Sequence, residues 1–379
     1  MCARLRDLIE EIPSEKSDSE VSLRGYDILS YPADFTLEVL VGKWKKGEIV
    51  VPSLQRRFIW SQVRASKLIE SFLMGLPVPP VFFYQDKNTN KLLVVDGHQR
   101  LRSIVDFFSG EFGDDNARGE KPSFTLIGLD EKSPFLDATY ESLQKKHNEA
   151  AYNKLNNSVL RSFVIKQINP HDNTSIFQIF ERLNTGGVIL QGQEIRNCIY
   201  EGPFNDTLSG RDRKNSLNKY KPWRKIFGSA AEDKRQRDVE LILRFLALFY
   251  NLDAYEKPMK KFLNDFMRDN RRATGERLEE FKTVFRKTCD AVVEYLGEKP
   301  FHIHAGLNAA VYDSVFTAFA TNLDVLANKY VTKSSRSQLK MKFELLTKNK
   351  AYLKLVSAAT TDEDVIPKRI RIAKRILFG

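Results

Sequence analysis

The chain has 379 residues, 42% of them hydrophobic, and a formal net charge of +11 at pH 7. This length and composition suit two domains with real cores and exclude a fibrous or repetitive protein. The basic charge favours polyanionic partners, either nucleotides or nucleic acid. Its three cysteines, Cys2, Cys198 and Cys289, are far apart in the sequence, which argues against a disulfide framework or a cysteine-based metal site.

The N-terminal residues 1–26 are polar and mixed in charge, so we expect a mobile leader. No segment of the sequence approaches the roughly 18 uninterrupted apolar residues of a membrane-spanning helix. We therefore expect no membrane association and a cytoplasmic location.

The first half of the chain predicts alternating helices and strands. We expect helices at 35–44 and 61–73, the second one ended by Gly75, and a short strand at 49–51 stopped by Pro52. Strands at 81–85 and 92–95 should form a hairpin with its turn at 88–90. A further strand pair is expected at 121–129, a polar helix at 141–158 and a strand at 159–167.

Residues 92–108 are the centre of the argument. The β-branched run 92–95 predicts a buried strand, and Asp96-Gly97 a tight turn. From His98 onward the apolar residues recur at helical spacing. The segment therefore predicts a strand, a turn and a helix in direct succession.

A helix that begins directly after a buried strand presents unpaired backbone N–H groups, which suit an anion such as phosphate. Its first turn carries Gln99, Arg100 and Arg102, and an arginine fork matches phosphate oxygens well. Asp96 and His98 lie beside it. The alternative is that Asp96 only caps the helix and that the arginines are only solvated.

Two later segments are also candidates. A helix at 173–183 ends at Asn184-Thr185-Gly186-Gly187, where the glycines either approach a phosphate or simply stop the helix. Glu194 and Asn197 share a helix face and can hold magnesium through water or orient a water molecule. A capping role for Glu194 is the alternative.

After residue 203 the pattern is helical throughout, which predicts an all-α bundle. The expected helices are 239–250, 259–267, 277–296, 305–326, 337–346 and 367–379. Glu240 and Arg244, four residues apart, are expected to pair with each other. His302 and His304 lack companions at metal spacing, so we expect structural roles for them and no metal site.

Residues 211–225 contain seven basic residues and one acid, with Tyr220 and Trp223 between them. Such a segment can follow a phosphate backbone while its rings stack, and a solvated connector is the alternative. The candidate nucleic-acid-binding residues are Arg211, Arg213, Lys214, Lys221 and Arg224.

The segment Asp96-Gly97-His98-Gln99-Arg100 resembles the Asp-Gly-Gln-Gln-Arg motif of the ParB/sulfiredoxin-like superfamily, in the branch that forms the N-terminal domain of GmrSD-type modification-dependent restriction enzymes. Residues 52–60, 180–187 and 193–197 resemble further segments of that family in the same order, and weaker similarity extends through 237–245. His98 departs from the motif's glutamine.

The resemblance implies an α+β fold: a ParB/sulfiredoxin-like small mixed sheet with flanking helices, here followed by the helical bundle. We expect a leader at 1–26, the nucleotide-binding domain at 27–203 and the helical domain at 204–379. The family's His-Asn-His nuclease motif is not found in this sequence, so we expect a stand-alone member.

The resulting hypothesis is a nucleoside-triphosphate-binding and hydrolysing protein in defence against foreign or modified DNA, with Mg²⁺ and GTP or ATP. Expected partners are DNA and a separate nuclease or modification-system protein. The alternatives are a non-catalytic nucleotide-dependent DNA-binding switch and a ParB-like DNA nickase. The expected catalytic residues are Asp96, Glu194 and His98, and the expected nucleotide-binding residues are Gln55, Arg56, Gly97, Gln99, Arg100, Arg182, Asn184 and Arg196.

Overall fold

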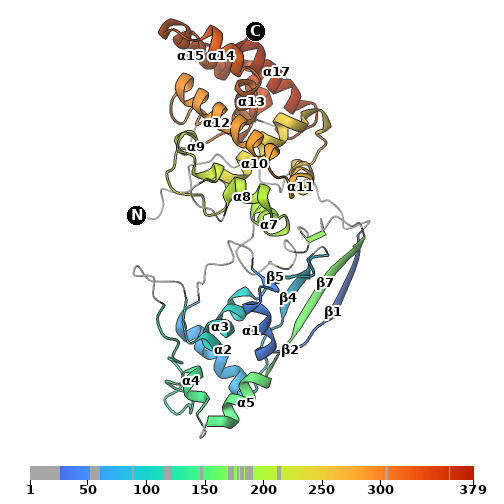
Figure 1. Cartoon of the computed structure of the whole chain (residues 1–379), viewed down its shortest axis with the longest axis vertical. Helices are drawn as coiled ribbons and strands as arrows, with labels where there is room; N and C mark the ends of the chain where they lie inside the picture. Colours follow the sequence, from blue (N-terminus) through green and yellow to red (C-terminus); the bar gives the residue numbers. More distant parts are fainter. Residues whose placement is uncertain are drawn as a thin grey trace. The chain divides into compact units, whose positions relative to one another are not determined.

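A computed structural model gives the fold as two compact units, drawn in Figure 1. It describes residues 26–51, 60–87, 89–113, 121–145, 148–169, 175–176, 179, 183, 191–210, 215–303, 306–357 and 359–379. The first unit comprises the described residues up to 183, and the second comprises those from 191 onward. The first is a mixed α+β unit and the second is helical, which confirms the predicted fold class.

The first unit contains a five-stranded mixed sheet in the order β1-β7-β4-β5-β3. Its strands are β1 Asp27–Pro32, β3 Ile49–Val50, β4 Val81–Gln85, β5 Leu92–Asp96 and β7 Ser162–Asn169. β3 is parallel to β5, and β4 is antiparallel to β5 and parallel to β7. Consequently the carboxyl ends of β3 and β5 and the amino ends of β4 and β7 meet at one edge of the sheet.

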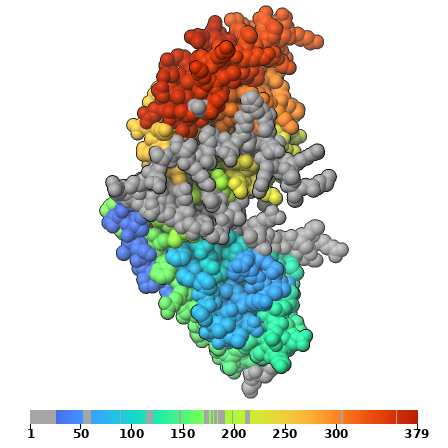
Figure 2. All heavy atoms as spheres, turned by 180° about the vertical axis from the view of Figure 1, so that it is seen from behind, coloured from blue at the N-terminus to red at the C-terminus, as the bar shows by residue number. Residues whose placement is uncertain are grey.

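In the described part of this unit, the helices that flank the sheet include α1 Leu37–Lys45, α2 Gln62–Met74, α3 His98–Ser109, α4 Tyr140–Leu143 and α5 Glu149–Asn157. Local chemistry explains where α2 begins and ends. Ser61 caps its first turn by accepting from the Arg64 N–H, and Gly75 ends it in the left-handed conformation, with φ 78°. Figure 2 shows α2 (blue) on the surface of this unit beside green residues of the segment around α4 and α5.

The core of the first unit lies between these helices and one face of the sheet. Leu40, Ile69, Phe83, Val94 and Ile104 are all at most 5% exposed and belong to one cluster. Three of these residues come from helices α1, α2 and α3, and two come from strands β4 and β5. The apolar faces of the helices are therefore buried against the sheet, which holds α3 in place on it.

Some sequence predictions for this unit were wrong. The segment 121–129 forms no strand pair, because its one ladder contact is an isolated bridge between Glu111 and Ser123. β1 and the two-residue strand β2 Phe35–Thr36 were not expected. The predicted strand 159–167 is present as two strands, β6 Val159–Leu160, which pairs with β2, and β7. The predicted helix 141–158 is two helices, α4 and α5.

The second unit is a bundle. Its helices are α7 Gly192–Ile199, α8 Pro203–Ser209, α9 Lys221–Phe227, α10 Arg237–Asn251, α11 Met259–Asn270, α12 Glu276–Leu296, α13 Ala309–Ala320, α14 Leu323–Lys329, α15 Lys333–Lys348, α16 Lys350–Ser357 and α17 Val365–Leu377. Every residue of α13 is buried, and it packs against α10, α12 and α17. α13 is therefore the central helix of the bundle.

Two expectations for the bundle differ from the structure. The predicted helix 305–326 is broken between α13 and α14, at Thr321 and Asn322. Glu240 and Arg244 do not pair with each other: Glu240 binds Arg196 of α7 at 2.7 Å, and Arg244 binds Asp313 of α13 at 2.6 Å. Both partners, the Arg196 guanidinium and the Asp313 carboxylate, lie on other helices, which a spacing of four residues on one helix cannot show.

The division between the units falls at residues 190 and 191, so α7 belongs to the bundle, whereas composition placed the boundary at 203 and 204. In the described part of the chain, no helix combines the length and the apolar character needed to cross a bilayer.

Candidate functional site

The candidate anion site is the junction between β5 and α3, at the sheet edge described above. β5 ends at Asp96, Gly97 adopts φ 91°, and α3 begins at His98. A Cβ at position 97 would lie 2.5 Å from Val81 Cγ1, so glycine is required by both the backbone angle and the close approach of β4. The predicted strand-turn-helix arrangement is present.

The first turn of α3 has no side-chain cap, because Gly97 is the N-cap residue and Asp96 turns to Arg100 instead. Because the N-cap residue supplies no side-chain oxygen, the positive end of the helix dipole favours a negatively charged group at this position. Asp96 therefore does not cap α3, which was the alternative interpretation of the sequence.

Arg100 is held at the same edge by two hydrogen bonds. Its Nη2 donates to Asp96 Oδ2 at 2.9 Å and to the carbonyl oxygen of Pro80 at 3.0 Å. The Arg100 side chain is 18% exposed and that of Asp96 is 40% exposed. Its Nε is buried and has no hydrogen-bond partner, so the guanidinium retains unused donor capacity beside an accessible carboxylate.

His98 and Gln99 form a chain of hydrogen bonds with Trp60. The backbone N–H of Trp60 donates to Gln99 Oε1 at 3.3 Å, which fixes the orientation of the Gln99 amide. The amide nitrogen then donates to His98 Nε2 at 2.7 Å, so this ring nitrogen accepts and Nδ1 carries the proton. Burial lowers the pKa of His98 to about 4; the nearby Asp96 raises it and Arg100 lowers it. His98 is therefore neutral at pH 7.

Arg102 has a different role from Arg100. Its Nε donates to Asp106 Oδ1 at 2.6 Å and its Nη2 to the carbonyl oxygen of Gly113, while the Gly113 N–H donates to Asp106 at 3.0 Å. Asp106 is 5% exposed. Arg102 thus fastens the chain that leaves α3 and is not directed to the anion site.

Several predicted nucleotide-binding residues, namely Gln55, Arg56, Arg182 and Asn184, lie outside the described residues. The residues that flank Gln55 and Arg56 are described: Val51 follows β3, and Trp60 is bonded to Gln99 of α3. Both flanking residues lie at the edge where Asp96 and Gly97 lie.

Glu194 lies in α7 of the helical unit and is 2% exposed. Its carboxylate accepts the backbone N–H of Gln191 and so caps the helix. Burial raises the pKa of Glu194 to about 7, opposed by that hydrogen bond and by Arg235. Asn197 of the same helix accepts from Gln193 at 2.8 Å.

Arg196, another predicted nucleotide-binding residue, is fully buried in the bundle. Its guanidinium donates to Glu240 at 2.7 Å, to Gln193 at 2.9 Å and to Asn264 at 3.3 Å. These contacts favour a structural role, because the guanidinium is already shared among three buried acceptors.

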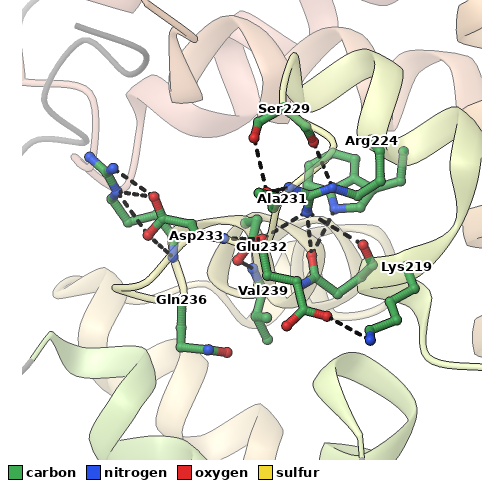
Figure 3. A network of polar contacts seen from close by, with 12 residues as sticks. Lys219, Arg224, Ser229, Ala231, Glu232, Asp233, Gln236 and Val239 are labelled. Atoms are coloured by element: carbon green, nitrogen blue, oxygen red, sulfur yellow. Dashed lines mark hydrogen bonds and ion pairs between the residues drawn. The ribbon is translucent and has the colours of Figure 1, made fainter. Parts of the chain in front are cut away.

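Of the predicted nucleic-acid-binding residues, Arg211, Arg213 and Lys214 lie outside the described residues, and Lys221 is exposed. Arg224 is 9% exposed and binds Asp238 at 2.7 Å, Asn218 at 3.0 Å and the carbonyl oxygens of Ser229 and Ala231 (Figure 3). It holds the loop before α10 in place.

The neighbours of Arg224 are also engaged. Lys219 pairs with Glu232 at 3.2 Å and Lys225 with Glu298 at 3.0 Å. Trp223 is fully buried and Tyr220 donates to Asp290, so the structure places these rings in packing and hydrogen bonding instead of leaving them open for stacking on bases. The described part of this segment behaves largely as a connector.

No cluster of three or more histidine, cysteine, aspartate or glutamate side chains suited to a metal ion is found among the described residues. His302 lies in an isolated bridge with Leu307, and His304 lies outside the described residues.

Sequence reasoning missed two members of the β5–α3 site. The Pro80 carbonyl and the Trp60 N–H contribute backbone atoms, whose partners depend on tertiary contacts. The only indication in the sequence was that Trp60 lies just before Ser61, the residue that caps α2.

Comparison with known families agrees with this geometry. Residues 37–201 match the family model described as GmrSD restriction endonuclease, N-terminal domain. The predicted resemblance is confirmed over this stretch, which is consistent with a GmrSD N-terminal domain. No curated protein matched the chain. The family match points to a restriction-type role.

Proposed function

We propose that the chain binds a nucleoside triphosphate at the β5–α3 junction and hydrolyses it, and that this activity regulates engagement of foreign or modified DNA. The observation that supports this most is Arg100, whose guanidinium is 18% exposed and lies beside the first turn of α3, where the N-cap residue Gly97 offers no side-chain cap. The planar guanidinium and the backbone N–H groups at the start of the helix are two kinds of donor that bind phosphate oxygens well.

Asp96 is the candidate for orienting the attacking water. Its side chain is 40% exposed, so a water molecule can reach it. In-line hydrolysis needs chiefly positioning and neutralisation of phosphate charge. Mg²⁺ commonly binds through one or two carboxylates together with phosphate oxygens and water, and Asp96 fits that requirement; the ion would neutralise phosphate charge.

A specific observation favours the second candidate, a switch that binds nucleotide without turnover. Asp96 is paired with Arg100 at 2.9 Å, so its Oδ2 already accepts a hydrogen bond and is not free to accept one from an attacking water molecule. The two candidates therefore differ in whether nucleotide phosphates take Arg100 away from Asp96.

The test is phosphate release from ATP, GTP, CTP and UTP with Mg²⁺, with and without DNA, alongside nucleotide binding by calorimetry. We expect release that Arg100→Ala abolishes and Arg100→Lys reduces, since a lysine keeps the charge but loses the fork. Lys67→Ala, which removes an exposed cation from α2, is the control and should have no effect.

Arg100→Ala leaves the partly buried Pro80 carbonyl and the Asp96 carboxylate with fewer partners, which costs about 1–3 kcal/mol, so thermal unfolding is measured in parallel. Saturable binding without release would support the switch. A folded Arg100→Ala variant that binds nucleotide as the wild type does would refute both candidates.

A further inference from the structure

The excess positive charge of the chain is concentrated near its C-terminal end. Residues 333–379 contain twelve lysine and arginine residues and four acidic residues, which is a net charge of +8 out of +11 for the whole chain. Residues 1–190 contain 24 basic and 25 acidic residues, a net charge of −1. Most of the positive charge from which we inferred a polyanionic partner therefore lies in the segment that contains the last three helices.

These three helices, α15, α16 and α17, pack against one another. Their residues (red) form a continuous region of the surface at one end of the helical unit in Figure 2. The apolar side of α17, with Ile366, Ile370 and Leu377, is at most 2% exposed. Lys368, Arg371 and Arg375 are exposed on the outer side of α17, whereas Arg369 is buried and binds Asp313.

Basic side chains project from α15 and α16. Lys340 and Lys348 of α15 are exposed, as is Lys333 at its start. On α16, Lys350 and Lys354 are exposed and lie four residues apart, so they share one face of the helix.

Arg371 and Arg375 repeat this spacing on α17 and are also exposed. Within the described ranges, neither these two arginines nor the five lysines of α15 and α16 have an ion-pair or hydrogen-bond partner for their side chains. We call these seven residues the C-terminal basic surface.

Of the four acids in 333–379, Glu344 is exposed on α15 between Lys340 and Lys348 and offsets part of their charge, while the other three are engaged elsewhere. Asp362 pairs with Lys257 at 2.7 Å, Asp364 pairs with Lys368, and Glu363 accepts the Lys257 backbone N–H. Such unpaired, solvated cations attract a partner with dense negative charge. In the described part of 211–225, by contrast, Lys219, Arg224 and Lys225 already have acidic partners.

We propose that the C-terminal basic surface binds the phosphate backbone of duplex DNA. The inference rests on the proposed function for the identity of the polyanion, while the charge distribution is independent of it. Exposed lysines contact phosphates as point charges and carry no base information. This surface therefore holds the duplex without selecting its sequence.

Duplex DNA fits better than an anionic membrane. A helix that lies on a bilayer inserts its apolar face, and that face of α17 is buried in the bundle. Met341 and Leu345 of α15 are exposed, 55% and 64%, but two side chains offer little apolar area for insertion.

The test is fluorescence anisotropy of a labelled 30-base-pair duplex with the full chain over a range of salt concentrations, without nucleotide. The variant replaces Lys350, Lys354, Arg371 and Arg375 by glutamine. The control replaces four exposed lysines elsewhere, Lys67, Lys91, Lys132 and Lys287, by glutamine, so that net charge falls equally.

We expect the variant to lose at least about tenfold in affinity and its logarithmic salt slope to fall by roughly 0.9 for each phosphate contact removed. The control should keep its slope. Equal losses in both proteins, no binding of the duplex by the wild type, or binding of phosphatidylserine vesicles in preference to the duplex would each overturn the proposal.

Failure of this inference is distinguishable from failure of the proposed function. Phosphate release that depends on Arg100, together with DNA affinity insensitive to the four substitutions, would refute the C-terminal basic surface alone. DNA affinity lost in the variant, without phosphate release from any nucleotide, would support the surface and refute the hydrolase.

Discussion

Arg100 Nη2 and Asp96 Oδ2 lie 2.9 Å apart, so the strongest cation of the candidate site and its most accessible carboxylate neutralise each other in this structure. A nucleotide phosphate would compete with Asp96 for the same guanidinium. Binding and activation of the carboxylate are then linked, since a phosphate that takes Arg100 releases Asp96 to accept from water.

Asp96→Asn tests this linkage. The amide still accepts a hydrogen bond from Arg100 but is not a base, so we expect nucleotide affinity to stay within about threefold while phosphate release falls roughly a hundredfold or more. Calorimetry and a phosphate assay on the same preparation separate the two effects. Unchanged release would remove Asp96 from the catalytic role.

His98 should make the first unit less stable in acid. Its folded-state pKa is about 4 and its ordinary pKa is 6.5, so the unfolded chain takes up the proton first. Stability should therefore fall as pH drops from about 6.5 towards 4, measured by urea unfolding. In His98→Gln this part of the pH dependence should disappear, and an unchanged profile would contradict the assignment.

Glu194 should act in the opposite direction in the helical unit. Its pKa is raised from 4.5 to about 7, so the folded chain holds the proton that the unfolded chain has already lost. The stabilising contribution is present below about pH 4.5 and is lost as pH rises through 7. Glu194→Gln should flatten this slope, and a slope that persists would point to another group.

Asp313 should be essential to the bundle. It is fully buried between Arg244 and Arg369, at 2.6 and 2.9 Å, and its removal leaves two buried cations without their shared partner. We expect Asp313→Ala to lower the free energy of unfolding by about 3–5 kcal/mol. Replacing all three residues by leucine or methionine should recover most of that loss, and a cost below about 1 kcal/mol for Asp313→Ala would count against the network.

The sequence predicted the elements around the candidate site well because their signals are local. The β-branched run before Asp96, the glycine at 97 and the helical spacing after His98 act over a few residues. The helix stop at Gly75 has the same character. By contrast, 121–129 has strand-like composition but no partner strand, and β pairing is a tertiary property.

Side-chain partners were the least predictable part. Arg100 and Arg102 are two residues apart in one helix turn, yet one lies at the sheet edge and the other is fastened to Asp106. Trp223 and Arg224 look like nucleic-acid contacts in the sequence, but burial directs them inward. Whether a basic side chain has an ion-pair partner depends on the positions of acidic residues from distant helices, and these positions cannot be predicted from the local sequence.

The separate partners of Glu240 and Arg244 have a consequence for α10. These residues lie one turn apart and bind opposite charges on two different helices, Arg196 of α7 and Asp313 of α13. If α10 slid by one turn so that Arg244 took the place of Glu240, it would meet Arg196, a like charge in a buried setting. The alternation of charge along α10 therefore specifies its register, so that only one axial position of the helix satisfies both neighbours.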